Sequence, residues 1–415
     1  MFFSKLFLSL VNLNVLIYAL SLILLITGCK KVNNDCNLKD YPNAPNKEWT
    51  SEIAGSQSEA HGHYILTCSD GGFIQIGETG TLPNSAKIMV VKTDETGKLL
   101  WKKEFSDGGH NLGNSVIETK NAYIICGAIN ENSAIIKLNK NSGAVIFNQT
   151  IDNGGNDAFE NIICTSGGII AVGYVNANDP NNTFFTEGEG YLTVLDSNGS
   201  KIKGLNLNNH IAHAYRIRKI ENNLFISGLT KNASDYGLLK TNLEGNIIWS
   251  KRYGGALEDH CFGMDVSDDG SIFLTGHTKS GTQNWDTYTT KIDTSGNQLW
   301  EIKCGNPRGF NPKFIHDEAW DIKSTNDGGC IVIAGTGDEY NRYKRRCGNS
   351  GDNSNTWHIY LIKLDQNGNL DWQKTYGGGK GTDWAGEAID LTPDGGAIIA
   401  LDNGKFGFVK ISPFQ

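Results

Sequence analysis

The sequence predicts an all-β protein: a seven-bladed β-propeller of four-stranded blades, closed by an N-terminal strand that completes the last blade. Two short units recur along the chain, and each is a pair of strands around a tight turn. The composition agrees, because 50 glycines against 8 prolines suit many tight turns. A charged fraction of 20% also fits short strands with polar turns better than long helices.

The first unit is a strand, an Asp-x-x-Gly turn and a second strand that begins near a tryptophan. It is clearest at 360–372, YLIKLDQNGNLDW, and recurs at 90–101, 238–249 and 289–300. Weaker copies are found at 135–147 and 192–202, and a half copy at 408–412. An aspartate at the start of such a turn bonds its own backbone, and the glycine supplies a positive φ.

The second unit comes before each copy of the first and consists of two strands around an Asp-Gly-Gly or similar turn. The stretch 319–336, AWDIKSTNDGGCIVIAGT, is typical. Such dipeptides between alternating apolar residues are the strongest short hairpin signal. Each period therefore holds four strands, which we name a, b, c and d in chain order. We count seven periods, with six or eight as the alternatives because the second to fourth repeats are degraded.

The two ends of the repeat region predict how the ring closes. A strand resembling d, EWTSEIAG at 48–55, comes before the first period, and the last period stops after strand c. If the first strand completes the last blade, no blade keeps an unpaired edge. Four-stranded units repeated at this spacing are typical of β-propellers, in which the blades bury one another's apolar faces.

The segment before the repeats predicts export and lipidation. An apolar run from Leu6 to Ile26 leads into Ile26-Thr27-Gly28-Cys29, which resembles a bacterial lipobox. We expect residues 1–29 to be a lipoprotein signal peptide with Cys29 lipidated, and 30–47 to be a flexible tether. The alternative is an uncleaved transmembrane anchor.

Eight further cysteines show no Cys-x-x-Cys spacing, so a structural zinc site is not expected. Cys126 and Cys164 lie in apolar strand contexts and are interpreted as small buried hydrophobes. An exported protein could form disulfides, but the sequence leaves their pairing open.

The repeats also carry a family resemblance. Asp94 to Trp101, DETGKLLW, resembles the tryptophan-docking repeat of pyrroloquinoline-quinone-like propellers, which include quinoprotein dehydrogenases and an outer-membrane-assembly lipoprotein. The wider repeat resembles propellers of bacterial surface lipoproteins. The adjacent cysteine pair and cofactor pattern of the dehydrogenases are missing, so no cofactor is expected. The tryptophans expected to pack between blades, with carbohydrate stacking as the alternative, are Trp49, Trp101, Trp249, Trp300 and Trp372.

The strand order predicts two different faces. Since successive strands of a blade are antiparallel, the a–b and c–d turns lie on one face and the b–c and d–a connections on the other. The first set is short and uniform, and we call its side the short-turn face. The second set is long and irregular, with b–c members at 79–87, 176–190, 279–286 and 337–356 and a d–a member at 305–316. We expect this long-loop face to be the working face.

Two groups of residues on the long-loop face are candidate sites. Blade six brings together a basic and aromatic patch that could hold an anionic glycan, a phosphate or an acidic partner, the alternative being solvated loops without a ligand. The patch consists of Arg308, Lys313, Arg342, Tyr343, Lys344, Arg345 and Arg346.

The second group consists of His61, His213 and His260, which align at one position near the start of strand a, with Glu318 in blade six. With Glu258 and Asp259 these imidazoles could coordinate a metal. They come from blades one, four and five, which favours the alternative that they are polar side chains lining the channel.

The functional classes follow from charge and motifs. A net charge of −8 argues against nucleic acid as a partner. The sequence lacks a P-loop, a Gly-x-Ser-x-Gly elbow and a His-Glu-x-x-His motif. We expect a lipid-anchored monomer at the bacterial outer membrane or cell surface that binds an envelope protein or glycan without catalysis. The alternatives are a polysaccharide hydrolase or lyase with its site at the channel mouth, and a scaffold in envelope assembly.

Overall fold

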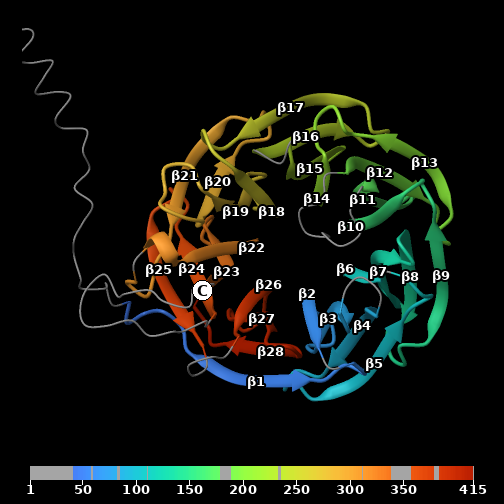
Figure 1. Cartoon of the computed structure of the whole chain (residues 1–415), viewed down its shortest axis with the longest axis horizontal. Helices are drawn as coiled ribbons and strands as arrows, with labels where there is room; N and C mark the ends of the chain where they lie inside the picture. Colours follow the sequence, from blue (N-terminus) through green and yellow to red (C-terminus); the bar gives the residue numbers. More distant parts are fainter. Residues whose placement is uncertain are drawn as a thin grey trace, which may run out of the picture. The chain divides into compact units, whose positions relative to one another are not determined.

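A computed structural model of the chain describes residues 41–57, 59–81, 85–109, 111–177, 188–231, 235–310, 312–337, 357–377 and 383–414. In this part of the chain 28 strands form seven antiparallel four-stranded sheets around a common axis (Figure 1). The predicted fold class, the four strands per blade and the number of blades are therefore confirmed.

The strands follow the predicted a–b–c–d order in every blade. Blades one to three consist of β2 (Ala60–Thr67), β3 (Phe73–Thr79), β4 (Lys87–Thr93) and β5 (Leu99–Phe105); β6 (Leu112–Glu118), β7 (Ala122–Ile129), β8 (Asn132–Asn139) and β9 (Val145–Ile151); and β10 (Asn156–Thr165), β11 (Gly168–Ala177), β12 (Glu189–Leu195) and β13 (Lys201–Asn206).

Blades four to six continue the same order. They consist of β14 (His213–Ile220), β15 (Asn223–Leu229), β16 (Tyr236–Asn242) and β17 (Ile247–Tyr253); β18 (Asp259–Val266), β19 (Ile272–Thr278), β20 (Asp286–Ile292) and β21 (Gln298–Cys304); and, after a short 3₁₀ helix η1 (Pro312–Phe314), β22 (His316–Ser324), β23 (Cys330–Gly337), β24 (His358–Leu364) and β25 (Leu370–Tyr376).

Blade seven combines both ends of the propeller. Its strands are β26 (Ala385–Leu391), β27 (Ala397–Asp402), β28 (Phe406–Ile411) and, as strand d, β1 (Lys47–Ile53). β1 pairs antiparallel with β28, with Trp49 opposite Lys410 and Ile53 opposite Phe406. The predicted closure is confirmed, and neither strand is left with the open edge that it would have alone.

The core lies between blades, around strands b and c. Every residue of β3 and β7 is buried, whereas strands d such as β9 and β17 are largely exposed. A typical cluster joins Ile76 and Val90 of blade one to Ile125 and Ile136 of blade two. Both faces of each sheet are apolar and only neighbouring blades can cover them, so the ring is the unit that folds.

Trp49 and Trp300 of strand d each pack under the c–d turn of the following blade. A Cβ atom on Gly97 would lie 2.6 Å from the ring of Trp49, and one on Gly368 would lie 2.6 Å from the ring of Trp300. The Trp300 indole N–H donates to the carbonyl of Gln366 at 3.0 Å. Both glycines have a φ of 80°, so the turn needs glycine for its backbone and for its space. Inter-blade packing of these tryptophans is confirmed.

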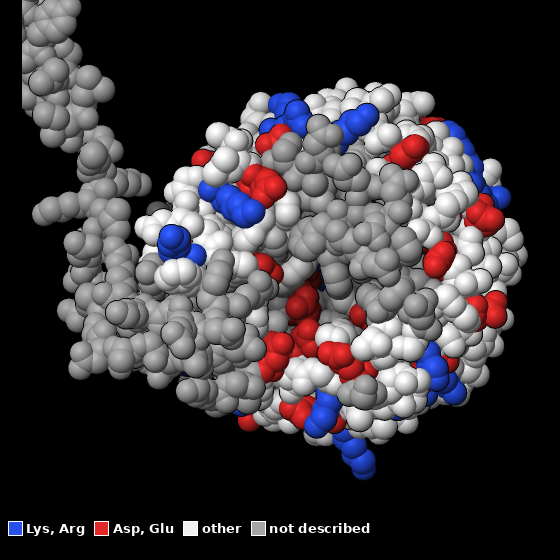
Figure 2. Space-filling view, viewed as in Figure 1, with Lys and Arg blue, Asp and Glu red and all other residues white. Residues whose placement is uncertain are grey.

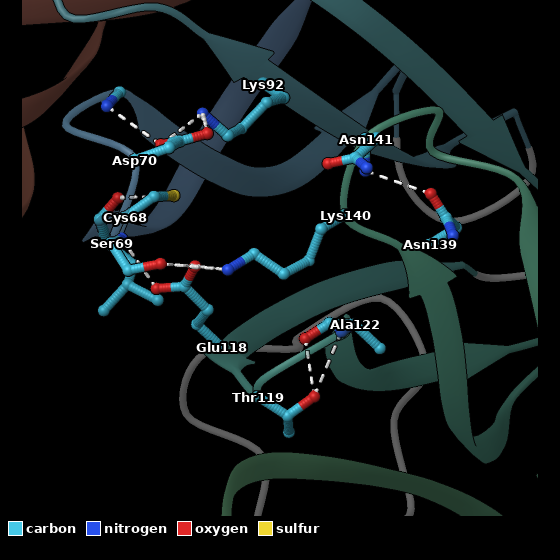
Figure 3. Close-up of polar contacts among 12 residues, drawn as sticks. Cys68, Ser69, Asp70, Lys92, Glu118, Thr119, Ala122, Asn139, Lys140 and Asn141 are labelled. Atoms are coloured by element: carbon cyan, nitrogen blue, oxygen red, sulfur yellow. Dashed lines mark hydrogen bonds and ion pairs between the residues drawn. The ribbon is translucent and has the colours of Figure 1, made fainter.

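Buried lysines tie the two hairpins of a blade together on the short-turn face. Lys92 of strand c is 1% exposed, and its ammonium lies 3.0 Å from the carboxylate of Asp70 in the a–b turn (Figure 3). The same pair recurs in blade six as Lys363 and Asp327 at 2.6 Å, and in blade seven as Lys410 and Asp394 at 2.9 Å. Glu118 of blade two links neighbouring blades by accepting from the Ser69 backbone N–H and hydroxyl of blade one at 2.8 Å each.

The chain just before β1 is part of the propeller rather than free tether. Ala44 is buried, and the Tyr376 hydroxyl and Lys374 ammonium donate to the carbonyl of Pro45 at 2.7 and 2.8 Å. Residues 41–46, which the sequence assigns to the tether, therefore pack on blade six.

The cysteines and the membrane-span prediction can be compared with the described part of the chain. Cys126 is buried as expected, but Cys164 is exposed, because it lies near the solvent end of β10. Six cysteines lie in the described part of the chain and all are free; Cys29 lies outside it. Among the described residues, no helix has the length and hydropathy needed to cross a membrane.

Candidate binding site at the channel mouth

The aligned histidines lie at one position of the innermost strands. His61 is opposite Glu78, His213 opposite Leu229 and His260 opposite His277, in each case two residues before a register shift of strand a. Glu318 occupies the same position in blade six, opposite Gly335. Strand a starts on the long-loop face, so these residues lie near the long-loop end of the channel.

The three histidines do not converge on one point. His61 Nδ1 lies 2.8 Å from a carboxylate oxygen of Asp402, and His213 Nε2 lies 2.9 Å from one of Glu160. The His260 ring instead packs against Trp285, with 4.7 Å between ring centroids. Glu258 pairs with Lys279 at 2.7 Å, and the buried Asp259 accepts from the backbone N–H of Gly255 at 2.6 Å.

These separate contacts bear on the metal hypothesis. Within the described ranges, no three or more His, Cys, Asp or Glu side chains are grouped as a metal would require. A shared metal on His61, His213 and His260 therefore stays a prediction from the sequence alone.

A β-bulge in every innermost strand builds the channel wall. The register of strand a against strand b shifts at the same level in every blade, so that one residue per blade is left out of the ladder there. In blade three β10 has a second shift nearer its start, at Asp157. Bulges of this kind redirect a side chain and often lie beside functional sites. The seven bulge residues, in blade order, are His63, Asn114, Glu160, Tyr215, Phe262, Trp320 and Glu387.

These seven residues line one pocket. Leu112 and Arg216 complete its lining, and the pocket encloses ≈ 50 Å³. That volume holds a few water molecules or the end of a ligand. The bulges follow the histidine position along strand a, so the pocket lies one step below the channel mouth on the long-loop face.

One half of the pocket wall is aromatic. Tyr215 of blade four meets Phe262 of blade five edge to face, with 4.8 Å between ring centroids. Phe262 in turn packs on Trp320 of blade six at 4.6 Å. Three rings from consecutive blades thus form a continuous apolar surface, on which the body of a ligand can pack.

The other half of the wall is polar. The Asn114 amide donates to the carbonyl of Phe159 at 3.0 Å, and His63 Nε2 lies 2.6 Å from a carboxylate oxygen of Glu78. Burial raises the pKa of Glu387 to about 8, and the neighbouring Asp402 adds to the shift. Burial acts to lower the pKa of His63, but the charge of Glu78 and its hydrogen bond to the ring together raise that pKa. At neutral pH the polar half thus contains a protonated carboxyl group at Glu387.

The mouth above the pocket is acidic. Figure 2 shows acidic side chains gathered around the central hollow. Glu59 directly precedes β2, Asp383 precedes β26 and Asp402 ends β27, so the topology brings all three to this edge. Burial acts to lower the pKa of His61, but the hydrogen bond and charge of Asp402 raise it to about 9, so this histidine offsets only part of the negative charge.

Below the pocket, side chains from three blades meet near the axis. The Arg216 guanidinium of blade four and the Lys323 ammonium of blade six each lie 5.8 Å from the ring centroid of Tyr64 in blade one. Lys323 pairs with Asp390 at 3.4 Å, and Arg218 pairs with Asp265 at the same distance. This layer forms a floor, so that the pocket faces the long-loop side.

Two members of the predicted basic patch lie in the described chain, and both are on the d–a connection between β21 and β22. An Arg308 guanidinium nitrogen donates to the carbonyl of Thr336 at 3.3 Å, and its guanidinium stacks on the ring of Phe310 at 4.9 Å. The Lys313 ammonium lies 5.9 Å from the ring of Phe314. The other members, Arg342, Tyr343, Lys344, Arg345 and Arg346, lie outside the described residues.

Sequence reasoning missed the bulge residues. They differ in type in almost every blade, so the repeat gives them no common signature. The available signal is a large side chain that breaks the alternation of strand a, a fixed distance before the a–b turn. Only the register of the hydrogen bonds shows that all seven such positions face one pocket.

The comparisons with known proteins agree on the fold. The WD40 domain of Neurospora crassa Pan2 is similar, with a TM-score of 0.58 and 12% identity over 90% of this chain and 97% of that chain. Virginiamycin B lyase from Staphylococcus aureus is similar with a TM-score of 0.55 and 14% identity over 87% and 99%. The WD40 propeller domain of Doa1 is similar with a TM-score of 0.54 and 13% identity over 88% and 96%.

Identities this low show a shared fold and nothing finer. No protein-family model matches the chain, and no curated protein sequence matches it. Fold and site together define the class: a seven-bladed β-propeller with a lined pocket at one end of its channel.

Proposed function

We propose that this protein is a lipid-anchored binding module of the bacterial outer envelope, which takes a protein or glycan on its long-loop face without catalysis. The observation that carries the proposal is the pocket formed by one bulge residue from each of the seven blades. A rigid ring that points seven different side chains into one opening is suited to recognition. The histidines are held apart by separate partners, which favours binding over chemistry at the mouth.

In this proposal the short-turn face meets the membrane and the long-loop face stays free. Strand d begins at the short-turn face. Exposed aliphatic side chains occupy the second position of strand d in five consecutive blades, beside the same face. They are Leu100, Ile146, Ile202, Ile248 and Leu299, each more than half exposed. A membrane on the short-turn side would cover them and leave the long-loop face free.

Lipidation is tested by labelling cells with an alkyne fatty acid and following the protein in membrane fractions. We expect the wild-type protein to carry the label and to sediment with the outer membrane, and Cys29→Ala to lose the label. Label retained in Cys29→Ala would contradict the anchor.

Binding is tested with the unlipidated Cys29→Ala protein in pull-downs from envelope extracts and on glycan arrays. We expect captured partners to be lost when Trp320→Ala opens the aromatic wall, and kept when the matched control Trp384→Ala alters a tryptophan that does not line the pocket. Equal capture by both variants would remove the pocket from the binding site.

A second candidate function, polysaccharide cleavage, rests on Glu387. Burial keeps this pocket carboxyl protonated near neutral pH, as a general acid requires. The test is release of reducing ends from envelope polysaccharides by wild type and Glu387→Gln. If reducing ends are released by the wild type and not by Glu387→Gln, cleavage replaces the binding proposal. If neither protein releases them, the binding proposal is supported.

A further inference from the structure

One charged residue of the pocket makes no ion pair within the described chain. Arg216 is 7% exposed and lines the pocket. Its Nη1 donates to the carbonyl of Tyr215 at 3.1 Å, its Nε has no hydrogen-bond partner, and no carboxylate of the described chain lies within 4.0 Å of the guanidinium. Two residues further along β14, Arg218 has such a partner in Asp265 at 3.4 Å.

A buried cation without a direct ion-pair partner is costly, because it loses its hydration and gains little in return. Contact with the Tyr64 ring at 5.8 Å recovers only part of that loss. An anionic group of a ligand at the pocket floor would complete the hydrogen bonding of Arg216. A planar carboxylate suits it best, since guanidinium and carboxylate match in geometry.

At the channel mouth the ligand needs a positive charge, opposite to the negative charge that Arg216 favours at the pocket floor. A purely anionic ligand would have to pass the acidic side chains that surround the central hollow in Figure 2. The topology brings Glu59, Asp383 and Asp402 to this edge of the channel. A cationic group held at this level would be attracted instead. Between the mouth and the floor lies the aromatic wall of Tyr215, Phe262 and Trp320, which suits an apolar stem.

The spacing along strand a limits the length of that stem. His213 marks the mouth level and Arg216 the floor level in β14, three residues apart with a bulge between them. At about 3.3 Å per residue the two levels are separated by no more than about 10 Å. A chain of four to six methylene groups spans such a distance.

From these observations we infer that the pocket binds a zwitterionic ligand, with a carboxylate on Arg216, an ammonium or guanidinium group at the acidic mouth and a short apolar stem along the aromatic wall. Basic amino acids and ω-amino acids have this chemistry. The inference rests on the proposed binding function of the long-loop face and names the class of small ligand that this face accepts.

The test uses the unlipidated Cys29→Ala protein and three matched probes: 6-aminohexanoate, hexanoate without the ammonium, and hexylamine without the carboxylate. Binding is measured by calorimetry and by indole fluorescence. We expect 6-aminohexanoate to bind at least ten-fold more tightly than either other probe. Equal affinity for hexanoate would refute the cationic end of the ligand, equal affinity for hexylamine would refute the role of Arg216, and binding of no probe would refute the inference altogether.

Variants assign the two ends of the ligand. Arg216→Met is expected to keep a Tm at or above that of the parent protein, since a buried unpaired charge is removed, and to bind 6-aminohexanoate no better than hexylamine. Asp383→Asn, at an exposed mouth position, should weaken 6-aminohexanoate several-fold and leave hexanoate unchanged. It keeps the inference testable if Arg216→Met does not fold. The control Arg218→Lys, below the pocket, should leave all three affinities as they were.

The two proposals fail in different ways. Capture of envelope partners that depends on Trp320, together with no binding of any probe, would leave the binding module standing and refute the ligand class. Probe binding that depends on Arg216, without any captured macromolecule, would support the ligand class and refute the module that binds a protein or glycan.

Discussion

The two faces of this propeller are built by opposite rules. On the short-turn face the same residues recur from blade to blade, as in the turn glycines Gly97 and Gly368 under Trp49 and Trp300, and in the buried lysine–aspartate pairs. On the long-loop face equivalent positions hold different residues, from His63 to Trp320. Repeated residues thus hold the blades together, whereas unlike residues at repeated positions line the pocket.

The largest expected effect concerns two glycines of nearly equal backbone conformation. Gly368 on the short-turn face has a φ of 80° and Gly404 on the long-loop face a φ of 79°. A Cβ at Gly368 would meet the Trp300 ring at 2.6 Å, whereas one at Gly404 would meet nothing within 4 Å. We expect Gly368→Ala to lower the free energy of unfolding by about 3 kcal/mol and Gly404→Ala by about 1 kcal/mol.

Chemical denaturation of both variants measures the difference. Equal decreases in the free energy of unfolding would mean that the positive φ alone determines the effect of each substitution. The packing of the Trp300 ring against the turn would then contribute nothing measurable.

The next effect concerns two lysines. Lys363 on the short-turn face is 3% exposed and pairs with Asp327 at 2.6 Å. Lys405 on the long-loop side is half exposed and pairs with Glu52 at 3.0 Å. We expect Lys363→Met to cost about 2 kcal/mol, because a buried bond to the Leu364 carbonyl is lost with the ion pair. Lys405→Met should cost less than about 0.5 kcal/mol, as for exposed ion pairs.

Thermal unfolding at low and high salt distinguishes the two pairs. We expect the stability lost in Lys363→Met to change little with salt concentration. If salt reduces that loss as much as it reduces the loss in Lys405→Met, the pair on the short-turn face is screened like a surface pair.

The last effect is confined to high pH and is located at the pocket. Burial raises the pKa of Glu387 from 4.5 to about 8, so the folded state holds this proton more tightly than the unfolded state. The resulting stabilisation is fully present below pH 4.5 and is lost as the pH rises through about 8. We expect Glu387→Gln to match the wild type below pH 4.5 and to be more stable than the wild type by several kcal/mol at pH 9.

Denaturation curves of both proteins across this pH range provide the measurement. A constant difference between the two proteins at all pH values would show that Glu387 does not titrate in the pocket.

Much of the fold could be read from the repeats, for identifiable physical reasons. Asp365 and Gly368 predict a tight turn from backbone chemistry alone. The strand at 48–55 predicts that the ring closes by pairing with the last blade, because an unpaired strand edge is unfavourable. The alignment of His61, His213 and His260 was also within reach, since it follows from counting residues back from each turn. Their partners were not, because Asp402 and Glu160 come from other blades.

The pocket itself could be predicted only in part. The long-loop face was expected to carry the site, and the pocket lies there. The bulge residues escaped notice because a bulge is a feature of pairing between strands. Nothing in the letters Gly62-His63-Tyr64 marks the middle residue as the one left out of the ladder.

The sequence by itself determined the seven blades, their four strands and the division into two faces, because these follow from local turn chemistry and from the period of the repeat. Only the tertiary structure decided which side chains share the axis. Arg216, Glu387 and Trp320 lie far apart in the chain and become neighbours because seven blades must close a ring to bury their faces. Closure brings one bulge of each blade to the same level, and that level is where the pocket forms.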